Sequence, residues 1–293
     1  MAEAKVGIIG GSGLYKMKEM LDVEEVKIST PFGEPSDAII LGNLEGIRVA
    51  FLPRHGKGHR ISPGELPVKA NIYALKSLGV ERIISVSAVG SLKEEIQPLD
   101  LVIPDQLIDC TQGRDSTFFI NGIVAHITFA EPFCPVLSQI LFQAATEAGA
   151  KVHKGGLYLV MEGPQFSTKA ESQLYRAWGA DVVGMTALPE AKLAREAEIC
   201  YATLAFVTDY DCWHPSYESV TTEMILTNLR KGVDTARRIL KLTIPSIPHK
   251  RDCVCATALK DAIATSPKYI SDRAKKDLAL LIGKYLSKEE NAS

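Results

Sequence analysis

Long apolar runs, charge of one sign and low-complexity segments are all missing from this sequence of 293 residues. Its apolar stretches, such as Val6–Ile9 and Leu278–Ile282, fall far short of the roughly 18 residues that span a bilayer, which argues against a membrane-spanning helix. The 33 Lys and Arg residues against 35 Asp and Glu residues leave a net charge of −2, without a run of five like charges. Nucleic acid and membrane surfaces are therefore not expected as partners.

The N-terminal residues also lack the long apolar core of a secretory signal, because Gly10, Gly11 and Gly13 interrupt the first apolar run. A cytoplasmic location is the expectation. The apolar content of 46% and charged content of 23% are ordinary for a globular protein, which excludes disordered, collagen-like and coiled-coil classes. Composition alone does not select a function.

Cysteine is scarce, with six residues in the whole chain, which argues against a disulfide scaffold. Cys253 and Cys255 are one residue apart, a spacing too tight for the usual zinc site, and no second Cys or His pair lies nearby in the sequence. We therefore expect no metal. A disulfide between these two, or a longer one between Cys134 and Cys200, stays open for a thermophilic source, and reduced thiols are favoured otherwise.

The glycine turn after the first apolar run matches none of the common nucleotide or nucleophile motifs. A dinucleotide fingerprint starting from Gly11 would need glycine where Lys16 stands, and a nucleophile elbow would need glycine in place of Leu14. Walker A and HExxH patterns are absent as well. What remains is a set of small residues whose backbone N–H groups and Ser12 hydroxyl suit an anion of phosphate size. Taken alone, a structural turn is the better interpretation.

Hydrophobic periodicity predicts short strands that alternate with amphipathic helices. Alternation of this kind favours a largely parallel or mixed sheet with helices on both faces. Prolines 245 and 248 are expected to end the longest helix, which separates a domain of residues 1–248 from a C-terminal helical extension, residues 249–293, packed on the same domain. The predicted helices are 68–78, 135–148, 169–178, 190–197, 222–240 and 271–284, and the predicted strands are 5–9, 37–41, 48–52, 82–88, 101–104, 156–161, 182–185 and 201–207.

Cationic and small side chains follow two further predicted strands. Arg54 and His55 come after one of them, and Ser87 and Ala88 end another. Because ligands of open α/β sheets bind at the carboxyl ends of the strands, these strand ends are expected to converge on one site. The planar fork of arginine suits phosphate oxygens, although an isolated Arg-His pair is more often an ordinary surface feature.

Eight short segments, taken together, carry a resemblance to a known family. In order along residues 5 to about 248, the sequence resembles the 5′-methylthioadenosine phosphorylases, a trimer-forming branch of the purine nucleoside phosphorylases. The segments are 7–13 (GIIGGSG), 30–36 (TPFGEPS), 54–56 (RHG), 94–98 (EEIQP), 130–134 (AEPFC), 162–167 (EGPQFS), 185–190 (MTALPE) and 208–213 (TDYDCW).

The resemblance implies a single α/β/α sandwich domain around a mixed, partly closed sheet, assembled as a homotrimer or a dimer of trimers. The implied reaction converts 5′-methylthioadenosine and inorganic phosphate to adenine and 5-methylthioribose-1-phosphate in methionine and purine salvage, without a cofactor. Carried over by position, the phosphate would contact Gly10, Ser12, Arg54, His55, Ser87, Ala88 and Thr186. The nucleoside would contact Phe166, Ser167, Met185, Thr222, Ile225 and Leu226, with His126 supplied by a neighbouring subunit, and Asp209 and Asp211 would be the catalytic acids at the base edge.

Residue chemistry supports the implied role of Asp209. The departing purine gains negative charge and must be protonated or hydrogen-bonded at N7. A carboxyl group that follows an apolar strand, with Asp211 two residues away, is expected to have a raised pKa and to hold a proton near neutrality. Relatives that act on 6-oxopurines carry Glu where Ser167 stands and Asn where Asp209 stands. Both differences favour adenine, whose N6 amino group donates to a carboxylate oxygen.

The 5′ end of the nucleoside leaves two alternatives open. Thr222 stands where an aliphatic residue is expected, and Gly184 stands where some relatives carry Asn, so adenosine turnover beside methylthioadenosine is an alternative. A broader purine nucleoside phosphorylase, acting on adenosine, inosine or guanosine, is the runner-up interpretation. A binding or regulatory module without turnover is the third, and the combination of Arg54, His55 and Asp209 argues against it.

Overall fold

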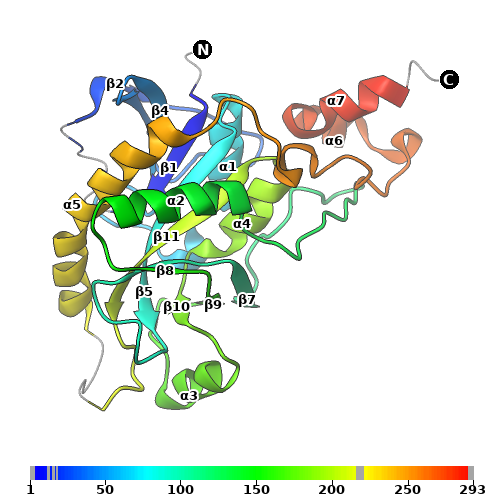
Figure 1. Ribbon diagram of the computed structural model, residues 1–293. Helices are drawn as coiled ribbons and strands as arrows, with labels where there is room; N and C mark the ends of the chain where they lie inside the picture. Colours follow the sequence, from blue (N-terminus) through cyan, green and yellow to red (C-terminus); the bar gives the residue numbers. More distant parts are fainter. Residues whose placement is uncertain (1–3, 12–13, 15–16, 18, 216–220, 290–293) are drawn as a thin grey trace.

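The computed structural model describes residues 4–11, 14, 17, 19–215 and 221–289. Strands and helices alternate along most of the chain, as predicted (Figure 1). The strands are β1 (Val6–Gly10), β2 (Leu21–Val26), β3 (Ile39–Leu44), β4 (Ile47–Pro53), β5 (Arg82–Ser91), β6 (Leu101–Ile103), β7 (Gln106–Cys110), β8 (Val152–Lys154), β9 (Leu157–Met161), β10 (Val182–Gly184) and β11 (Cys200–Asp209). The helices are α1 (Val68–Ser77), α2 (Pro135–Glu147), α3 (Lys169–Ala177), α4 (Ala187–Glu196), α5 (Thr222–Ser246), α6 (Asp272–Asp277) and α7 (Ala279–Glu289), with short 3₁₀ turns η1 (Pro63–Glu65), η2 (Val254–Thr257) and η3 (Pro267–Tyr269).

One mixed sheet of eleven strands forms the centre of the molecule. The long strand β5 pairs in parallel with β1 and β11, and its last residues pair antiparallel with β10. From β10 the sheet continues to β9 and β7, and from β11 it continues to β6 and β8. These two wings leave β5 on opposite sides and do not pair with each other in the described part of the chain. The sheet is therefore open, and the partial closure that we expected is not found.

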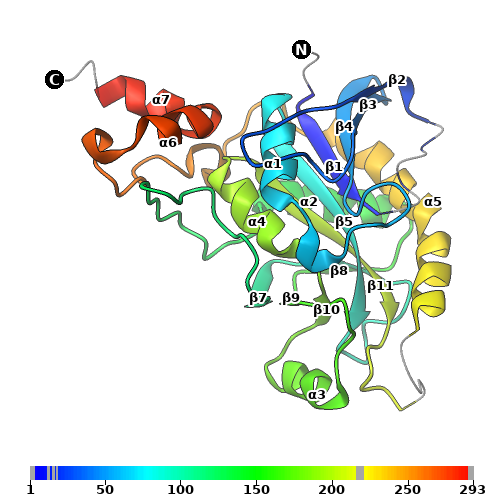
Figure 2. The same ribbon diagram turned by 180° about the vertical axis from the view of Figure 1, so that it is seen from behind.

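Helices cover both faces of this sheet, as predicted for a three-layer sandwich. Helices α1 and α4 lie together on one face, and α2 and α5 pack against each other on the opposite face (Figures 1 and 2). Strand β11 shows why both faces are apolar: Cys200, Ala202 and Leu204 point to the α2–α5 side, whereas Tyr201 and Ala205 point to the α1–α4 side. A strand that is buried on both faces reads as a continuous apolar run, which is what residues 200–207 are.

Three strands escaped prediction because their sequences carry little strand signal. β2 is a mostly exposed strand with acidic residues, β7 is partly buried with polar residues at Gln106 and Asp109, and β8 has only three residues. Tertiary pairing rather than local propensity places them in the sheet. The helix predictions hold closely, and Thr168 caps α3 through a reciprocal capping box with Glu171. No helix in the described residues has the length and apolar character needed to cross a membrane.

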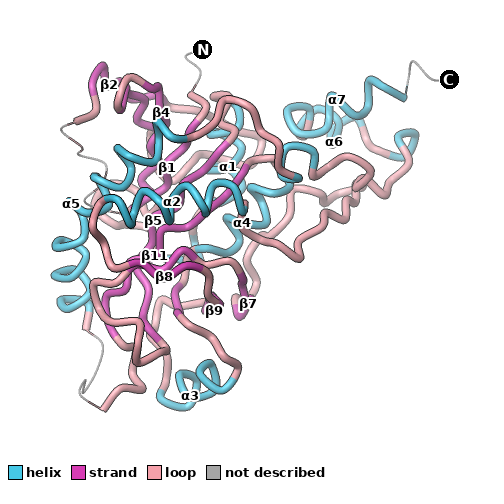
Figure 3. The backbone as a smooth tube through the Cα atoms, in the orientation of Figure 1, coloured by secondary structure: helices cyan, strands magenta, loops and turns pink. Residues whose placement is uncertain are grey.

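The C-terminal segment after α5 begins on the α2–α5 side, where Cys255 is buried, and its later residues reach the α1–α4 side of the domain (Figure 3). Helix α5 ends at Ser246, so its last turn contains Pro245 and is longer than predicted. The single predicted helix 271–284 is divided into α6 and α7 at Leu278. Leu259, Ile270 and Ile282 of this segment are buried in the same core cluster as α1 and α4.

Candidate active site

A cavity of about 350 Å³ opens where the carboxyl ends of β5, β10 and β11 meet the inner side of α5. This is the sheet edge at which ligands of open α/β folds bind, and the volume suits a small molecule. Most of the residues selected from the sequence line it: Arg54, His55, Ser87, Ala88, Phe166, Ser167, Met185, Thr186, Asp209, Asp211, Thr222, Ile225 and Leu226.

Two of the selected residues that the structure describes, Gly10 and His126, do not line the cavity. Gly10 ends β1 and uses its carbonyl to accept a hydrogen bond from the Arg54 backbone N–H at 2.9 Å, whereas the neighbouring Gly11 reaches the cavity. His126 is exposed and belongs to a segment that pairs with the C-terminal region, its N–H donating to Ala262 O at 2.8 Å. Ser12 lies outside the described residues.

Unpartnered hydroxyl groups gather at one end of the cavity. Ser87 Oγ and Thr186 Oγ1 are buried and lack a hydrogen-bond partner among the described residues, and the same is true of Tyr158 Oη. A buried hydroxyl without a partner costs free energy, so native structures rarely leave several in one place. Ser87 comes from β5 and Thr186 from the residue before α4. This end of the cavity therefore offers hydrogen bonds to a polar ligand.

Arg54 approaches the same end, but most of its guanidinium is already engaged. It is 2% exposed and forms a buried ion pair with Glu190, with Nε 2.5 Å from Oε1 and Nη2 3.2 Å from Oε2. Nη1 donates to Val86 O and Nη2 also donates to Ser85 Oγ. The sequence suggested that the planar fork faces an anion; the fork in fact faces Glu190. One of the two N–H groups on Nη1 is left for a ligand.

His55 presents a neutral imidazole to the cavity. Burial and the neighbouring Arg54 charge lower its pKa to about 4. Its Nδ1 lies 2.9 Å from the carbonyl oxygen of Ile61, so Nδ1 carries the proton and Nε2 is the hydrogen-bond acceptor. An acceptor at this position pairs with a protonated oxygen, such as the P–OH group of monohydrogen phosphate. His59 stacks on this ring at 4.2 Å between centroids and also lines the cavity.

Asp209 lies at the end of β11, where the strand reaches the cavity. Its side chain is 4% exposed, and burial raises its pKa to about 6. The carboxylate oxygens accept from Thr208 Oγ1 at 2.7 Å and from the Asp211 N–H at 2.8 Å. Gly90 makes room for it, because a Cβ there would stand 2.9 Å from Asp209 Oδ1. The result is a held carboxyl group that exchanges its proton close to neutral pH.

Asp211 occupies a turn with φ of 50°, in the left-handed region that few residues other than glycine adopt without cost. Burial raises the pKa of its carboxyl group, and Oδ2 lacks a hydrogen-bond partner in the part of the chain that is described. Strain and an unsatisfied buried oxygen at one residue are typical of functional sites. The two acids thus give the cavity one edge that donates and accepts protons.

The remaining wall is apolar. Met185 and Phe166 line it from one side, and Ile225 and Leu226 of α5 line it from the other. Phe166 is 41% exposed, so its ring is accessible to a flat ligand. Thr222 stands at the start of α5 on the same cavity. A flat apolar ligand of moderate size fits between these walls.

Gly184, which stands where some relatives carry Asn, is explained by Tyr158. A Cβ at residue 184 would stand 2.3 Å from the Tyr158 hydroxyl, so this phenol occupies the space of the missing side chain. Tyr158 is fully buried in β9 and its hydroxyl is one of the unpartnered groups. Tyr158 could not be recognised from the sequence as a polar group near the site, because a tyrosine in an apolar strand is indistinguishable from a core residue.

Two other contributors were missed or undervalued. Glu190 forms the ion pair with Arg54 and also accepts a hydrogen bond from Tyr201 Oη at 2.9 Å. The pattern of charges along the sequence does not reveal the Arg54–Glu190 pair. His59 also lines the cavity, although it lies outside every sequence motif named above. Within the described residues, the sole group of three or more possible metal ligands lies elsewhere, so this cavity does not contain a set of metal-binding side chains.

Comparison with known proteins gives a consistent result. The model of the phosphorylase superfamily matches residues 5–245. The S-methyl-5′-thioadenosine phosphorylase of Koribacter versatilis is 54% identical over 288 residues, covering 98% of this chain and 99% of the relative. A methylthioadenosine phosphorylase from an Antarctic soil metagenomic library has a solved structure with 51% identity and a TM-score of 0.92, covering 96% of this chain and 99% of that one. The methylthioadenosine phosphorylase of Schistosoma mansoni in complex with adenine is 37% identical with a TM-score of 0.81, covering 96% and 98%.

Identity at this level over nearly the whole chain, together with the shared fold, establishes the family. The chain belongs to the phosphorylase superfamily, among the S-methyl-5′-thioadenosine phosphorylases.

Proposed function

We propose that the protein cleaves 5′-methylthioadenosine with inorganic phosphate, releasing adenine and 5-methylthioribose-1-phosphate for methionine and purine salvage. The observation that carries the proposal is the layout of one cavity: unpartnered hydroxyls and Arg54 at one end, and the carboxyl of Asp209 at another edge. Phosphate approaches one face of the sugar while the purine leaves from the opposite face. The reaction therefore needs these two different environments at once.

In the proposed reaction, a phosphate oxygen forms a bond to C1′ of the ribose while the C1′–N9 bond breaks. The bonding electrons pass to the purine, and Asp209 supplies a proton at N7. Monohydrogen phosphate loses one proton on becoming the sugar phosphate, which balances the proton that adenine gains and leaves Asp209 ready for another cycle. Phosphate is already an adequate nucleophile, so Ser87, Thr186, His55 and Arg54 need only hold and orient it.

Adenine is the base that the site favours. A carboxylate accepts a hydrogen bond from the exocyclic N6 amino group and, when protonated, donates to N7. A 6-oxopurine presents an acceptor at the same edge and would face a second acceptor. Ser167 also lines the cavity, and its hydroxyl lies 3.5 Å from Met161 Sδ. Serine carries no charge, unlike the glutamate that stands at this position in relatives acting on 6-oxopurines. Mismatch of a buried polar edge lowers rates by orders of magnitude.

The substrate test combines the presence of phosphate with a change of nucleoside. Purified protein is incubated with methylthioadenosine, adenosine, inosine or guanosine, with and without phosphate, and the free base is measured by chromatography. We expect adenine from methylthioadenosine only when phosphate is present. Comparable release of hypoxanthine or guanine from inosine or guanosine would favour the broader purine nucleoside phosphorylase, and binding without any free base would favour a module without turnover.

We also propose that the active protein is a homo-oligomer, a trimer or a dimer of trimers, in which His126 completes the 5′ end of a neighbouring cavity. Two observations support this. His126 is exposed on its own chain and away from its own cavity, and Ile120 and Val124 close to it are exposed apolar residues. Light scattering gives the assembly, and His126→Ala is expected to raise KM for the nucleoside while leaving KM for phosphate unchanged. A monomer with full activity would contradict the proposal.

The pH dependence follows from the raised pKa of Asp209. Below about pH 6 the carboxyl is mostly protonated, and above it the protonated fraction falls about tenfold per unit. Because the protonated form is the one that donates to N7, kcat/KM for methylthioadenosine is expected to fall as pH rises from 6 to 8, relative to Asp209→Asn. The variant serves as the control because it reports the ionisation of phosphate itself. A ratio that rises over this range would rule out Asp209 as the proton donor.

A further inference from the structure

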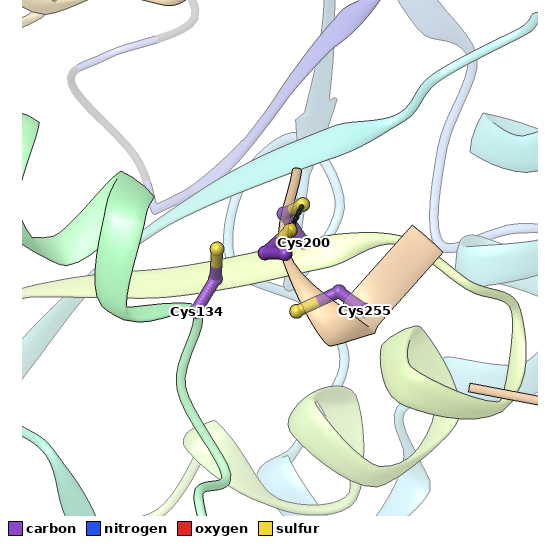
Figure 4. Close-up of side chains that lie close together, drawn as sticks. Cys134, Cys200 and Cys255 are labelled. Atoms are coloured by element: carbon purple, nitrogen blue, oxygen red, sulfur yellow. Dashed lines mark hydrogen bonds between the residues drawn. The ribbon is translucent and has the colours of Figure 1, made fainter. Parts of the chain in front are cut away.

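Four of the six cysteines meet at one place, although they come from distant parts of the sequence. Their Sγ atoms all lie within 4.8 Å of one another (Figure 4). One comes from the N-cap of α2, one from the first residue of β11, and two from the 3₁₀ turn η2 and its N-cap in the C-terminal segment. The four are Cys134, Cys200, Cys253 and Cys255, which we call the cysteine cluster. Since β11 runs from Cys200 to Asp209, about 30 Å of strand separates the cluster from the cavity.

The sulfur–sulfur distances in the cluster lie on either side of the distance expected for a zinc ion bound by four thiolates. Tetrahedral zinc with Zn–S bonds of about 2.3 Å places its sulfurs roughly 3.8 Å apart. Cys200 and Cys253 have Sγ atoms 3.3 Å apart, and no pair in the cluster exceeds 4.8 Å. Four sulfurs that are all close to one another can bind a single metal ion at their centre. Two disulfides would require only that each sulfur be close to one partner sulfur. Side-chain shifts of about half an ångström complete the tetrahedron.

The surroundings suit a closed structural site. Three of the four cysteines are buried and Cys253 is partly buried. A cavity of about 20 Å³ adjoins Cys134, Cys200 and Cys253, large enough for one small occupant. Cys134 also sits at the N-terminus of a helix of 13 residues, where the helix dipole stabilises a thiolate.

The charges around the cluster complement a negative centre. Zinc with four thiolates carries a net charge of −2. Arg82, Lys250 and Arg251 surround the small cavity, against the carboxylates of Glu81 and Asp252. Arg82 and Arg251 share Glu81, each at 3.4 Å, so among these five residues the cations outnumber the carboxylates by one. An anionic metal centre is therefore partly neutralised by the residues beside it.

Disulfides fit the observed geometry less well. An S–S bond is about 2.05 Å long, so even the pair at 3.3 Å would have to close by more than 1 Å. Each bond would also require an oxidant to remove two electrons and two protons, and the protein does not itself supply one. Zinc needs no redox partner, because four thiols simply release four protons as they become ligands.

We propose that the cysteine cluster binds one Zn²⁺ ion as a structural site. The ion ties the C-terminal segment to the domain, since Cys253 and Cys255 belong to that segment and Cys134 and Cys200 belong to the domain. Residues just beyond the cluster then reach the segment that carries His126, where Ala264 N–H donates to Val124 O at 2.9 Å. The metal thereby fixes a part of the chain that lies far from the cavity.

The experiment measures metal content and thiol chemistry on the full chain, purified without chelators from medium containing zinc. Mass spectrometry of the elements is expected to find one zinc per chain, and cobalt substitution is expected to give the intense visible bands of tetrahedral cobalt thiolate. Cys253→Ser is expected to lose most of the zinc. Cys110→Ser is the matched control, because Cys110 ends β7 outside the cluster, and this variant is expected to keep its zinc.

A second measurement keeps the proposal testable should Cys253→Ser fold poorly. Thiol titration of the denatured wild-type chain in the presence of a strong chelator is expected to count all six cysteines. In the native protein, the four thiols of the cysteine cluster are expected to be protected from the reagent until zinc is removed. Hydrogen exchange at residues 124–126 and 259–264 is expected to quicken on zinc removal. A metal-free protein with six free thiols overturns the proposal. A metal-free protein with only two free thiols overturns it as well, in favour of two disulfides.

Discussion

Replacing Asp209 by asparagine is expected to lower kcat for methylthioadenosine by about 10²–10⁴, the range that general acids contribute. Asparagine keeps the shape and accepts the same Asp211 N–H, but it has no proton to transfer to N7. Its amide donates to a 6-oxo group, so the ratio of inosine to methylthioadenosine turnover is expected to rise. Steady-state kinetics with both nucleosides at saturating phosphate measure the two effects together.

The same substitution is expected to make the protein more stable at alkaline pH. The folded state holds the pKa of Asp209 at about 6 against 3.8 for the free side chain, so above pH 6 the buried charge costs up to about 3 kcal/mol. Between pH 6 and pH 4 most of this cost disappears, because the folded carboxyl becomes protonated and the unfolded one begins to be. Thermal unfolding of Asp209→Asn is therefore expected at a higher temperature than wild type at pH 8 and at a similar temperature at pH 4. Loss of activity accompanied by loss of stability at pH 8 would indicate a structural role instead.

Removal of Arg54 is the second large effect. Arg54→Ala leaves Glu190 buried and without its cation, which is expected to destabilise the fold by about 3–5 kcal/mol. Loss of the free Nη1–H removes a charge-assisted hydrogen bond of about 1.5–3 kcal/mol, so KM for phosphate is expected to rise about 10–100-fold while KM for the nucleoside changes little. Urea unfolding and initial rates over a range of phosphate concentrations measure the two parts.

A paired variant separates the two roles of Arg54. Arg54→Met combined with Glu190→Gln removes both buried charges at once, and is expected to recover much of the lost stability because no ion is left unpaired. The phosphate requirement is expected to stay high, since the guanidinium is still missing. Recovery of a normal KM for phosphate in this double variant would show that Arg54 acts only by holding the fold.

Much of the fold could be predicted because its strands and helices carry strong apolar patterns. β11 is buried on both faces and α5 is long and amphipathic, so both were found from the sequence. β2 was not, because its residues are mostly exposed and acidic, and its place depends on pairing with β3. The branching of the sheet at β5 also lies beyond local patterns, since it follows from which strands compete for the two edges of one long strand.

The residues of the cavity were predictable only where a motif marks a strand end. Ser87, Asp209 and Thr186 were selected in this way, and all three line the cavity. Glu190 lies in one of the same motifs, yet its contact with Arg54 across 136 residues of sequence is visible only in three dimensions. The cysteine cluster shows the same limit more strongly. The spacing of Cys253 and Cys255 argued against metal because their partners lie more than 50 residues away along the chain.

A crystal structure of the protein with adenine and sulfate, the latter standing in for phosphate, tests the central claim most directly. The purine is expected to lie against Phe166 with its N7 about 2.6–3.2 Å from a carboxylate oxygen of Asp209. The sulfate is expected within hydrogen-bond distance of the Ser87 and Thr186 hydroxyls, which would give these unpartnered groups their ligand. A purine bound away from Asp209, or a sulfate that leaves both hydroxyls unpaired, would contradict the proposed reaction.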